Sequence, residues 1–225
     1  MRTENSVAPS QTLDRGLAVL EAIAAADRAL AVEDLARALG LHRSIVYRLV
    51  RTLEDRHLVE RDDGGRYSPG VRLAVLARHV QSGLRSAASG ALASLAEELG
   101  VTAFLVTRDG GEAITIDSVE PRRVDVHVAY RPGMRHPLDR GAPGLALLAG
   151  LPPVVGERAE VTAARAAGWV ATEGEVLPGM ASVAAPVLDL GAVAVLWLAA
   201  QPVDRDALVR HVVTAAAGIA ARLRT

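Results

Sequence analysis

One short stretch of the chain gathers side chains that are suited to contact with nucleic acid. Residues 39–59 read LGLHRSIVYRLVRTLEDRHLV and contain no acidic residue before Glu54. Arginine pairs with guanine edges through two hydrogen bonds or with phosphates through charge, and serine and tyrosine hydroxyls suit the same ligands. The candidate contacts to DNA are Arg43, Ser44, Tyr47, Arg48 and Arg51.

The same stretch has the pattern of an amphipathic helix. At 100° per residue its apolar side chains fall within an arc of about 140°, and the basic and hydroxyl side chains take the other side. The apolar set is Ile45, Val46, Leu49, Val50 and Leu53. A charged helix face alone is also typical of a simple solvated surface, so the neighbouring elements must decide between the two interpretations.

Those neighbours favour a winged helix-turn-helix over residues 10–70. The segments LDRGLAVLEAIAAA and AVEDLARALG predict two helices, the second of which ends at Gly40. The segment LVERDDGGRYSPG predicts a hairpin of Leu58–Arg61 and Arg66–Ser68 across a DDGG turn. Such a wing adds Arg61 and Arg66 as DNA contacts, although the acidic tip of the hairpin would repel phosphate.

A second domain is expected after a linker helix. Residues 71–90 predict the linker, with a bend near Gly83–Gly90, and residues 91–225 predict the second domain. Alternating apolar patterns predict an antiparallel sheet, and helical patterns flank it, which indicates an α+β fold. The expected strands are Val101–Thr107, Glu112–Ser118, Val124–Tyr130 and the segments SVAAPVLD and AVAVLWLAA. The expected helices are Pro143–Ala149, Glu157–Ala167 and Arg205–Leu223.

Composition narrows the functional classes. The 225 residues include no cysteine, which excludes disulfides, thiolate metal sites and cysteine nucleophiles. No apolar run approaches the roughly 18 residues of a membrane span, and residues 1–10 lack the apolar block of a secretion signal. The histidines are scattered, and the turn-like RDGG and DDGG segments lack the lysine of a phosphate-binding loop. We therefore expect a cytoplasmic protein that is no enzyme and has neither a cofactor nor a metal site.

Several longer segments resemble a known family. Residues 12–77, TLDRGLAVLEAIAAADRALAVEDLARALGLHRSIVYRLVRTLEDRHLVERDDGGRYSPGVRLAVLA, resemble the winged helix of IclR-type bacterial transcription regulators. The segments GMRHPLDRGAPGLALLAG and GWVATEGEVLPGMASVAAPVLD resemble the GAF-like effector-binding domain of that family. The resemblance implies a regulator that binds a palindromic operator as a dimer or as a dimer of dimers, a homotetramer, and that responds to a small organic effector.

The resemblance also implies an effector site in the second domain. Gly141 and Ala142 match two small residues whose backbone amides bind a carboxylate in the family. Other pocket positions depart from the family: a cysteine is Ser182, an acidic position falls near Thr172 and Glu173, and polar residues of the last strand are replaced. The replacements are Leu198 and Ala200. Few donors remain for a small carboxylate, so we expect a larger, apolar or aromatic effector, or none.

One alternative function remains open. The chain could be a ligand-sensing or protein-interaction module whose winged helix packs on a protein partner. His127 and His136 flank the loop that leads to the expected pocket and could touch a ligand, although the sequence favours exposed positions on a loop or strand for them. Salt dependence separates the two functions, because binding to DNA through arginine weakens steeply as salt rises.

Overall fold

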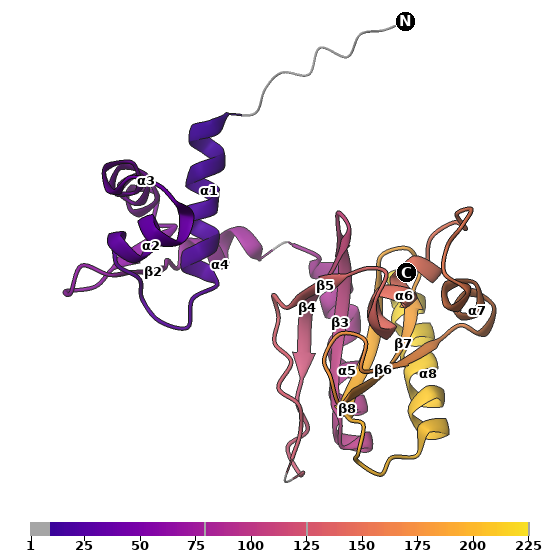
Figure 1. The fold of residues 1–225 in the computed structure, drawn as a ribbon. Helices are drawn as coiled ribbons and strands as arrows, with labels where there is room; N and C mark the ends of the chain where they lie inside the picture. Colours follow the sequence, from indigo (N-terminus) through magenta and orange to yellow (C-terminus); the bar gives the residue numbers. More distant parts are fainter. Residues whose placement is uncertain (1–9, 79, 125, 225) are drawn as a thin grey trace, which may run out of the picture. The chain divides into compact units, whose positions relative to one another are not determined.

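The structure, a computed structural model, describes residues 10–78, 80–124 and 126–224. The chain forms two compact units, Met1–Val80 and Gln81–Thr225, which are described separately (Figure 1). Both contain helices and strands, and the expected α+β class is confirmed.

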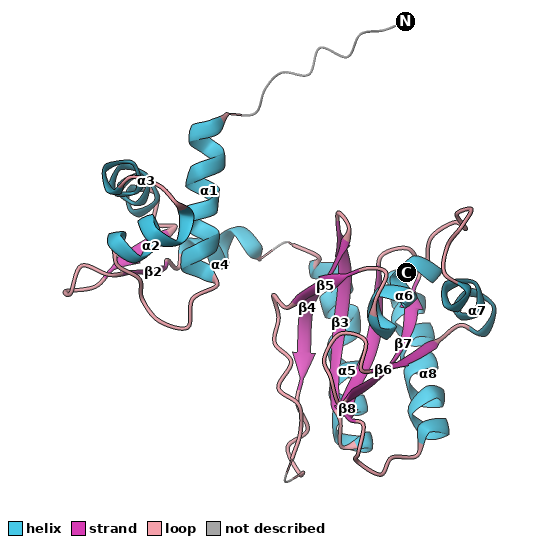
Figure 2. Ribbon diagram, viewed as in Figure 1, coloured by secondary structure: helices cyan, strands magenta, loops and turns pink. Residues whose placement is uncertain are grey.

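The N-terminal unit is a small helical domain with a two-stranded hairpin (Figure 2). Its elements are α1 (Gln11–Ala24), α2 (Val32–Leu39), α3 (Arg43–Asp55), β1 (Val59–Arg61), β2 (Tyr67–Pro69) and α4 (Arg72–Ala77). Strands β1 and β2 pair antiparallel, with Arg61 opposite Tyr67. The predicted helix-turn-helix and the hairpin that follows it are both present.

Buried aliphatic side chains hold these helices together. Val19, Leu35, Val46 and Val50 are completely buried in one apolar cluster, so α3 packs with its apolar side inward. Gly40 ends α2 with a φ of 63°, a left-handed conformation that glycine adopts without steric cost. The turn therefore starts α3 at a fixed angle, with the side chains opposite Val46 directed outward.

The C-terminal unit is built on a six-stranded antiparallel sheet in the order β5-β4-β3-β8-β7-β6. Helices α5 and α8 cover one face, while α6 packs on the other face together with α7 (Figure 1). The strands are β3 (Thr102–Asp109), β4 (Glu112–Val119), β5 (Arg135–Pro137), β6 (Val170–Glu173), β7 (Met180–Val187) and β8 (Gly191–Leu198). The helices are α5 (Ser82–Leu99), α6 (Gly141–Ala149), α7 (Ala159–Ala167) and α8 (Arg205–Leu223).

Strict alternation along the central strands supplies both layers of the core. On β3, Leu105 points to the layer of α5 and α8, and Phe104 points to the layer of α6. On β8, Val195 and Leu196 divide in the same way. Successive side chains of a strand point to opposite faces, and both faces are covered here, so residues 103–106 of β3 and all of β8 are apolar.

Three details differ from the expectations. No strand is formed by Val124 and residues 126–130, because the edge of β4 pairs instead with β5, with Glu112 opposite Pro137. Alternation of apolar and polar residues predicts a strand with one buried face, but it does not show which segment pairs with a free edge. Strand β6 was not predicted, and α5 runs unbroken through the expected bend near Gly83–Gly90, since the helix interruption lies earlier, between α4 and α5.

Helix α6 packs unusually close to its surroundings. Eight of its nine residues are buried, and a Cβ placed on Gly144 would lie 2.6 Å from the carbonyl oxygen of Leu138. Only glycine permits this approach of helix to backbone. The absence of a side chain at Gly144 therefore allows the start of α6 to lie directly against the backbone of Leu138.

Replacing Gly144 with alanine should lower the free energy of unfolding of the C-terminal unit by about 1–3 kcal/mol, the usual cost of overpacking. The matched control is Gly218→Ala in α8, where a Cβ would meet nothing within 4 Å. That control should be neutral or stabilise by up to about 1 kcal/mol through helix propensity. Urea unfolding followed by tryptophan fluorescence reports on this unit, since both tryptophans, Trp169 and Trp197, belong to it. Equal stabilities of the two variants would contradict the packing argument.

Candidate functional site

The outer side of α3 carries exposed polar side chains. Half of the surface of Tyr47 is exposed, and the Arg43 side chain is two-thirds exposed. A groove of about 670 Å³ lies between this face, the start of α2 and the β1–β2 hairpin. Its lining includes Arg43, Ser44, Tyr47, Arg48 and Arg61. The structure thus brings five of the seven predicted DNA contacts to one concave surface.

The residues of this surface differ in their partners. Arg43 pairs with Glu33 of α2, and the Ser44 hydroxyl lies 2.8 Å from Nδ1 of His42, which also accepts a bond from the Ser44 amide. Among the described residues, no ion pair engages the Arg48 side chain. Of the three arginines that line the groove, Arg43 is thus paired, whereas no ion pair within the described residues engages Arg48 or Arg61.

The hairpin positions the remaining wing arginines. Asp62 shapes the turn, because its Oδ1 accepts a 2.8 Å hydrogen bond from the Arg66 amide. The acidic tip thus has a structural role. The Arg66 guanidinium lies 3.8 Å from Asp34, whereas the Arg61 guanidinium lies 6.0 Å from the centre of the Tyr67 ring.

Two of the predicted DNA contacts do not line the groove, and one arginine near Arg48 was not among the predicted contacts. Arg51 and Arg66 do not line it, and Arg51 pairs with Glu54 at 3.8 Å. Arg15 of α1 lies with Arg48 along a second shallow depression. The apolar spacing around Arg15 predicts a helix, but it does not show that Arg15 lies near Arg48 of α3.

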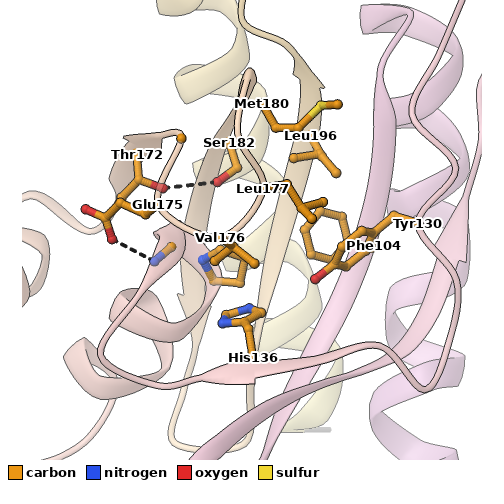
Figure 3. A pocket seen from close by; sticks show the side chains of 13 residues that line it. Phe104, Tyr130, His136, Thr172, Glu175, Val176, Leu177, Met180, Ser182 and Leu196 are labelled. Atoms are coloured by element: carbon orange, nitrogen blue, oxygen red, sulfur yellow. Dashed lines mark hydrogen bonds between the residues drawn. The ribbon is translucent and has the colours of Figure 1, made fainter.

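A second candidate site is a cavity on the α6 side of the sheet (Figure 3). Its wall is mainly apolar, and its free space is about 30 Å³, room for about two water molecules. The lining residues are Phe104, Tyr130, His136, Gly141, Pro143, Thr172, Gly174, Glu175, Val176, Leu177, Met180, Ser182 and Leu196. Tyr130 precedes β5 in the segment after β4, and the others come from β3, β5, β6, β7 and β8, the start of α6 and the loop after β6.

The first two amides of α6 meet side chains of the β6 region. The Gly141 amide donates a 2.8 Å hydrogen bond to Oε2 of Glu175, and the Ala142 amide donates a 2.8 Å bond to Oγ1 of Thr172. Thr172 in turn lies 3.4 Å from the Ser182 hydroxyl. Both amides that were expected to bind an effector carboxylate therefore have partners within the chain.

Glu175 is also held by a cation. The Arg158 guanidinium lies 3.2 and 3.3 Å from the two Glu175 oxygens and donates to the Asp139 carbonyl at 2.6 Å. Burial favours a raised pKa for Glu175, but the Gly141 amide and Arg158 outweigh it and lower the pKa. Glu160 and Glu175 raise the pKa of Arg158. The carboxylate and the guanidinium are thus both charged near neutral pH.

Two polar rings line the cavity as well. His136 is 4% exposed, and its Nδ1 lies 3.0 Å from the Pro137 carbonyl, which only accepts, so Nδ1 is the donor. Its buried Nε2 has no partner among the described residues. The Tyr130 ring packs on Phe104 with centroids 4.6 Å apart, and burial raises the pKa of its phenol, which stays protonated. The cavity thus offers one free acceptor and a phenolic hydroxyl.

Three predicted effector contacts lie elsewhere. Glu173 pairs with Arg205 at 3.1 Å and lines a different hollow, on the α8 side of the sheet. Leu198 and Ala200 do not line the cavity, whereas Leu196 does. Strand alternation places Glu173 and Thr172 on opposite faces, so the acidic residue of the cavity is Glu175, one residue beyond Gly174.

Other kinds of site find no support within the described ranges. No three His, Asp or Glu residues there are arranged to hold a metal ion. Nor does any helix that the structure describes combine the length and apolarity needed to cross a bilayer.

Comparisons with known proteins match segments of both units. Residues 12–63 match the IclR helix-turn-helix domain, and residues 77–160 match the C-terminal domain of the bacterial transcriptional regulator IclR. The regulator TtgV of Pseudomonas putida is 30% identical over 143 residues, 63% of this chain and 55% of TtgV. The glycerol operon regulatory protein of Streptomyces griseus is 30% identical over 204 residues, 80% of this chain and 79% of that protein.

Solved structures show the same fold. An IclR transcriptional regulator from Alicyclobacillus acidocaldarius has a TM-score of 0.81 at 24% identity, over 96% of this chain and all of that one. An IclR homologue from Microbacterium hydrocarbonoxydans, crystallised with 4-hydroxybenzoate, has a TM-score of 0.82 at 22% identity, over 95% and 99% of the two chains. With both domain matches and the Streptomyces relative, the chain belongs to the IclR family of transcriptional regulators.

Proposed function

We propose that the protein is a cytoplasmic, non-enzymatic regulator that binds a palindromic operator as a homodimer, or as a dimer of dimers, and responds to an aromatic effector. The observation that carries this proposal is the outer face of α3. Val46 and Val50 are buried on one side of the helix, while Tyr47 and Arg48 are exposed on the other. A helix anchored in this way can enter the major groove with these side chains leading.

Charge and hydroxyl groups support contact with DNA. We assign base and phosphate contacts to Arg48 and Tyr47, with further contacts from Arg43, Ser44 and Arg61. Arg51 and Arg66 lie beyond the groove, and we place them at flanking phosphates. Arg43 must release Glu33 to reach DNA, so its share of the affinity should be smaller than that of Arg48.

Dimerisation is supported by exposed apolar side chains of the first unit. One winged helix neutralises only a few phosphates, and two half-sites multiply the affinity. Leu13 and Leu17 of α1 are 62% and 49% exposed, and four more apolar residues are exposed within α4 and on either side of it. Those four are Val71, Val75, Leu76 and Val80. A second copy of the chain would remove this surface from water.

The residues of the cavity wall support an aromatic effector. Phe104, Tyr130 and Leu196 suit a flat apolar ring, and Nε2 of His136 accepts a bond from a ligand hydroxyl. One relative of the same fold was crystallised with 4-hydroxybenzoate, a molecule with both features. Gly141, Thr172 and Ser182 of the cavity wall, and Ala142 behind it through its bond to Thr172, complete the proposed site.

The direct test of the proposed function is capture of sheared genomic DNA by the purified full chain at two salt concentrations, with sequencing of the retained fragments. We expect a palindromic site that is enriched at low salt and lost at high salt. Absence of any enriched site, together with capture of a protein partner that persists at high salt, would favour the interaction module instead.

Replacing Arg48 with alanine should weaken binding to the selected operator by about 1–3 kcal/mol if Arg48 contacts a base edge. Fluorescence anisotropy with operator and scrambled duplexes measures this change. Arg37→Ala is the control, since Arg37 is exposed on α2, outside the groove, and pairs with Asp34. An equal loss on both duplexes would reassign Arg48 to phosphate contact, and no loss on either would remove it from the interface.

Filling the cavity should abolish the effector response. Met180 is half-buried on its wall, and Met180→Trp adds bulk there and leaves the sequence of the DNA-binding unit unchanged. Calorimetry should show 4-hydroxybenzoate binding to the wild type and none to the variant, with unchanged operator affinity in the absence of ligand. Equal binding to both proteins would place the effector site elsewhere. A lack of binding to the wild type would contradict the proposed effector class.

A further inference from the structure

The cavity already contains a carboxylate, supplied by the chain itself. Glu175 accepts the Gly141 amide at 2.8 Å and faces Arg158 through both oxygens. This is the set of partners that a carboxylate ligand needs: a helix N-terminal amide and a guanidinium. The structure therefore shows that this position binds a carboxylate, and it identifies the present occupant.

The occupant belongs to a short loop that fills the cavity. Residues 174–179 join β6 to β7, and both end residues, Gly174 and Gly179, have positive φ values of 71° and 74°. Val176 and Leu177 of this loop line the cavity beside Glu175 (Figure 3). A Cβ placed on Gly141 would lie 2.6 Å from Val176 Cγ2, so loop and helix are in close contact. The free space of about 30 Å³ cannot admit an aromatic ring while the loop stays in this position.

An unsatisfied group next to the carboxylate position also points to a ligand. His136 is almost completely buried, yet its Nε2 lacks a partner among the described residues. Its Cε1 would lie 3.8 Å from a Cβ on Gly141, so the ring borders the carboxylate position. Burying an acceptor without a hydrogen bond is unfavourable, and a ligand hydroxyl in the cavity would relieve this cost.

We propose that Glu175 is a tethered competitor of the effector: an aromatic carboxylate enters by displacing Glu175 from the Gly141 amide and Arg158, and the 174–179 loop moves out with it. This inference rests on the proposed effector site and names its ligand class and its control. A carboxylate that replaces Glu175 regains the same amide and guanidinium, whereas a neutral ligand does not. Glu175 thus selects for anionic ligands and sets a threshold concentration for them.

The experiment compares benzoate with its neutral analogue benzamide, by titration calorimetry on the full chain. Glu175→Gln removes the competing charge with little change in shape. Benzoate should bind this variant at least about tenfold more tightly than the wild type. Benzamide also needs the loop to open, so it should gain affinity too, but clearly less than benzoate, because only the anion is also relieved of repulsion by the displaced carboxylate. Glu173→Gln is the matched control, because Glu173 pairs with Arg205 outside the cavity, and it should leave both affinities unchanged. Glu175→Asp keeps the charge on a shorter side chain and should fall between the two.

Several results would overturn the proposal. Equal benzoate affinity in wild type and Glu175→Gln would show that Glu175 does not compete. An equal gain for benzamide would show that the loop only fills space, and failure of benzoate to bind either protein would show that the Gly141 amide takes no external carboxylate. The operator measurement separates this proposal from the proposed function. If benzoate displaces Glu175 but leaves operator affinity unchanged, the competition stands and the effector role fails.

Discussion

The C-terminal unit depends on how the first amides of a buried helix are satisfied. Helix α6 is buried along almost its entire length, so water cannot hydrate its N-terminal donors, and a buried donor without a partner is costly. Thr172 and Glu175 accept the Ala142 and Gly141 amides, and Arg158 balances the carboxylate. These contacts join α6 to β6, to the loop after it and to the start of α7. Gly141 also lines the cavity, so its amide serves both the fold and the proposed ligand site.

The N-terminal unit holds charged side chains on a helix that is fixed by its buried face. Its buried aliphatic cluster fixes α3, and Asp62 uses its side chain to form the hairpin turn rather than to meet a ligand. Arg43 and Arg66 face acidic residues of α2, whereas Arg48 has no such ion pair within the described part of the chain. The number of arginines therefore overstates the number of unpaired cations on this surface. Their ion pairs within the chain decide which of them are available to DNA.

Much of this architecture follows from the sequence, because helical and alternating periodicities record burial directly. The bounds of α8 agree with the expectation, and Gly40 ends α2 as its position suggested. Periodicity does not encode pairing partners, so β5 was missed, and a strand was wrongly expected at Val124 and residues 126–130. It also leaves the direction of single side chains open: Glu173 and Glu175 differ by two residues across Gly174, and only the latter reaches α6. The family resemblance pointed to the amides of Gly141 and Ala142 as ligand donors, but it did not indicate that Glu175 accepts the Gly141 amide.

The most direct test of this account is residue-resolved amide hydrogen exchange on the ligand-free protein, measured by NMR. The amides of Gly141 and Ala142 should exchange slowly, like those of the α6 interior, although the start of a helix normally exchanges fast. Leu13 provides the internal reference, since it lies exposed in the first turn of α1, where no side chain caps the helix. Exchange at Gly141 and Ala142 as fast as at Leu13 would contradict the account, because it would mean that Glu175 and Thr172 do not hold these amides in solution.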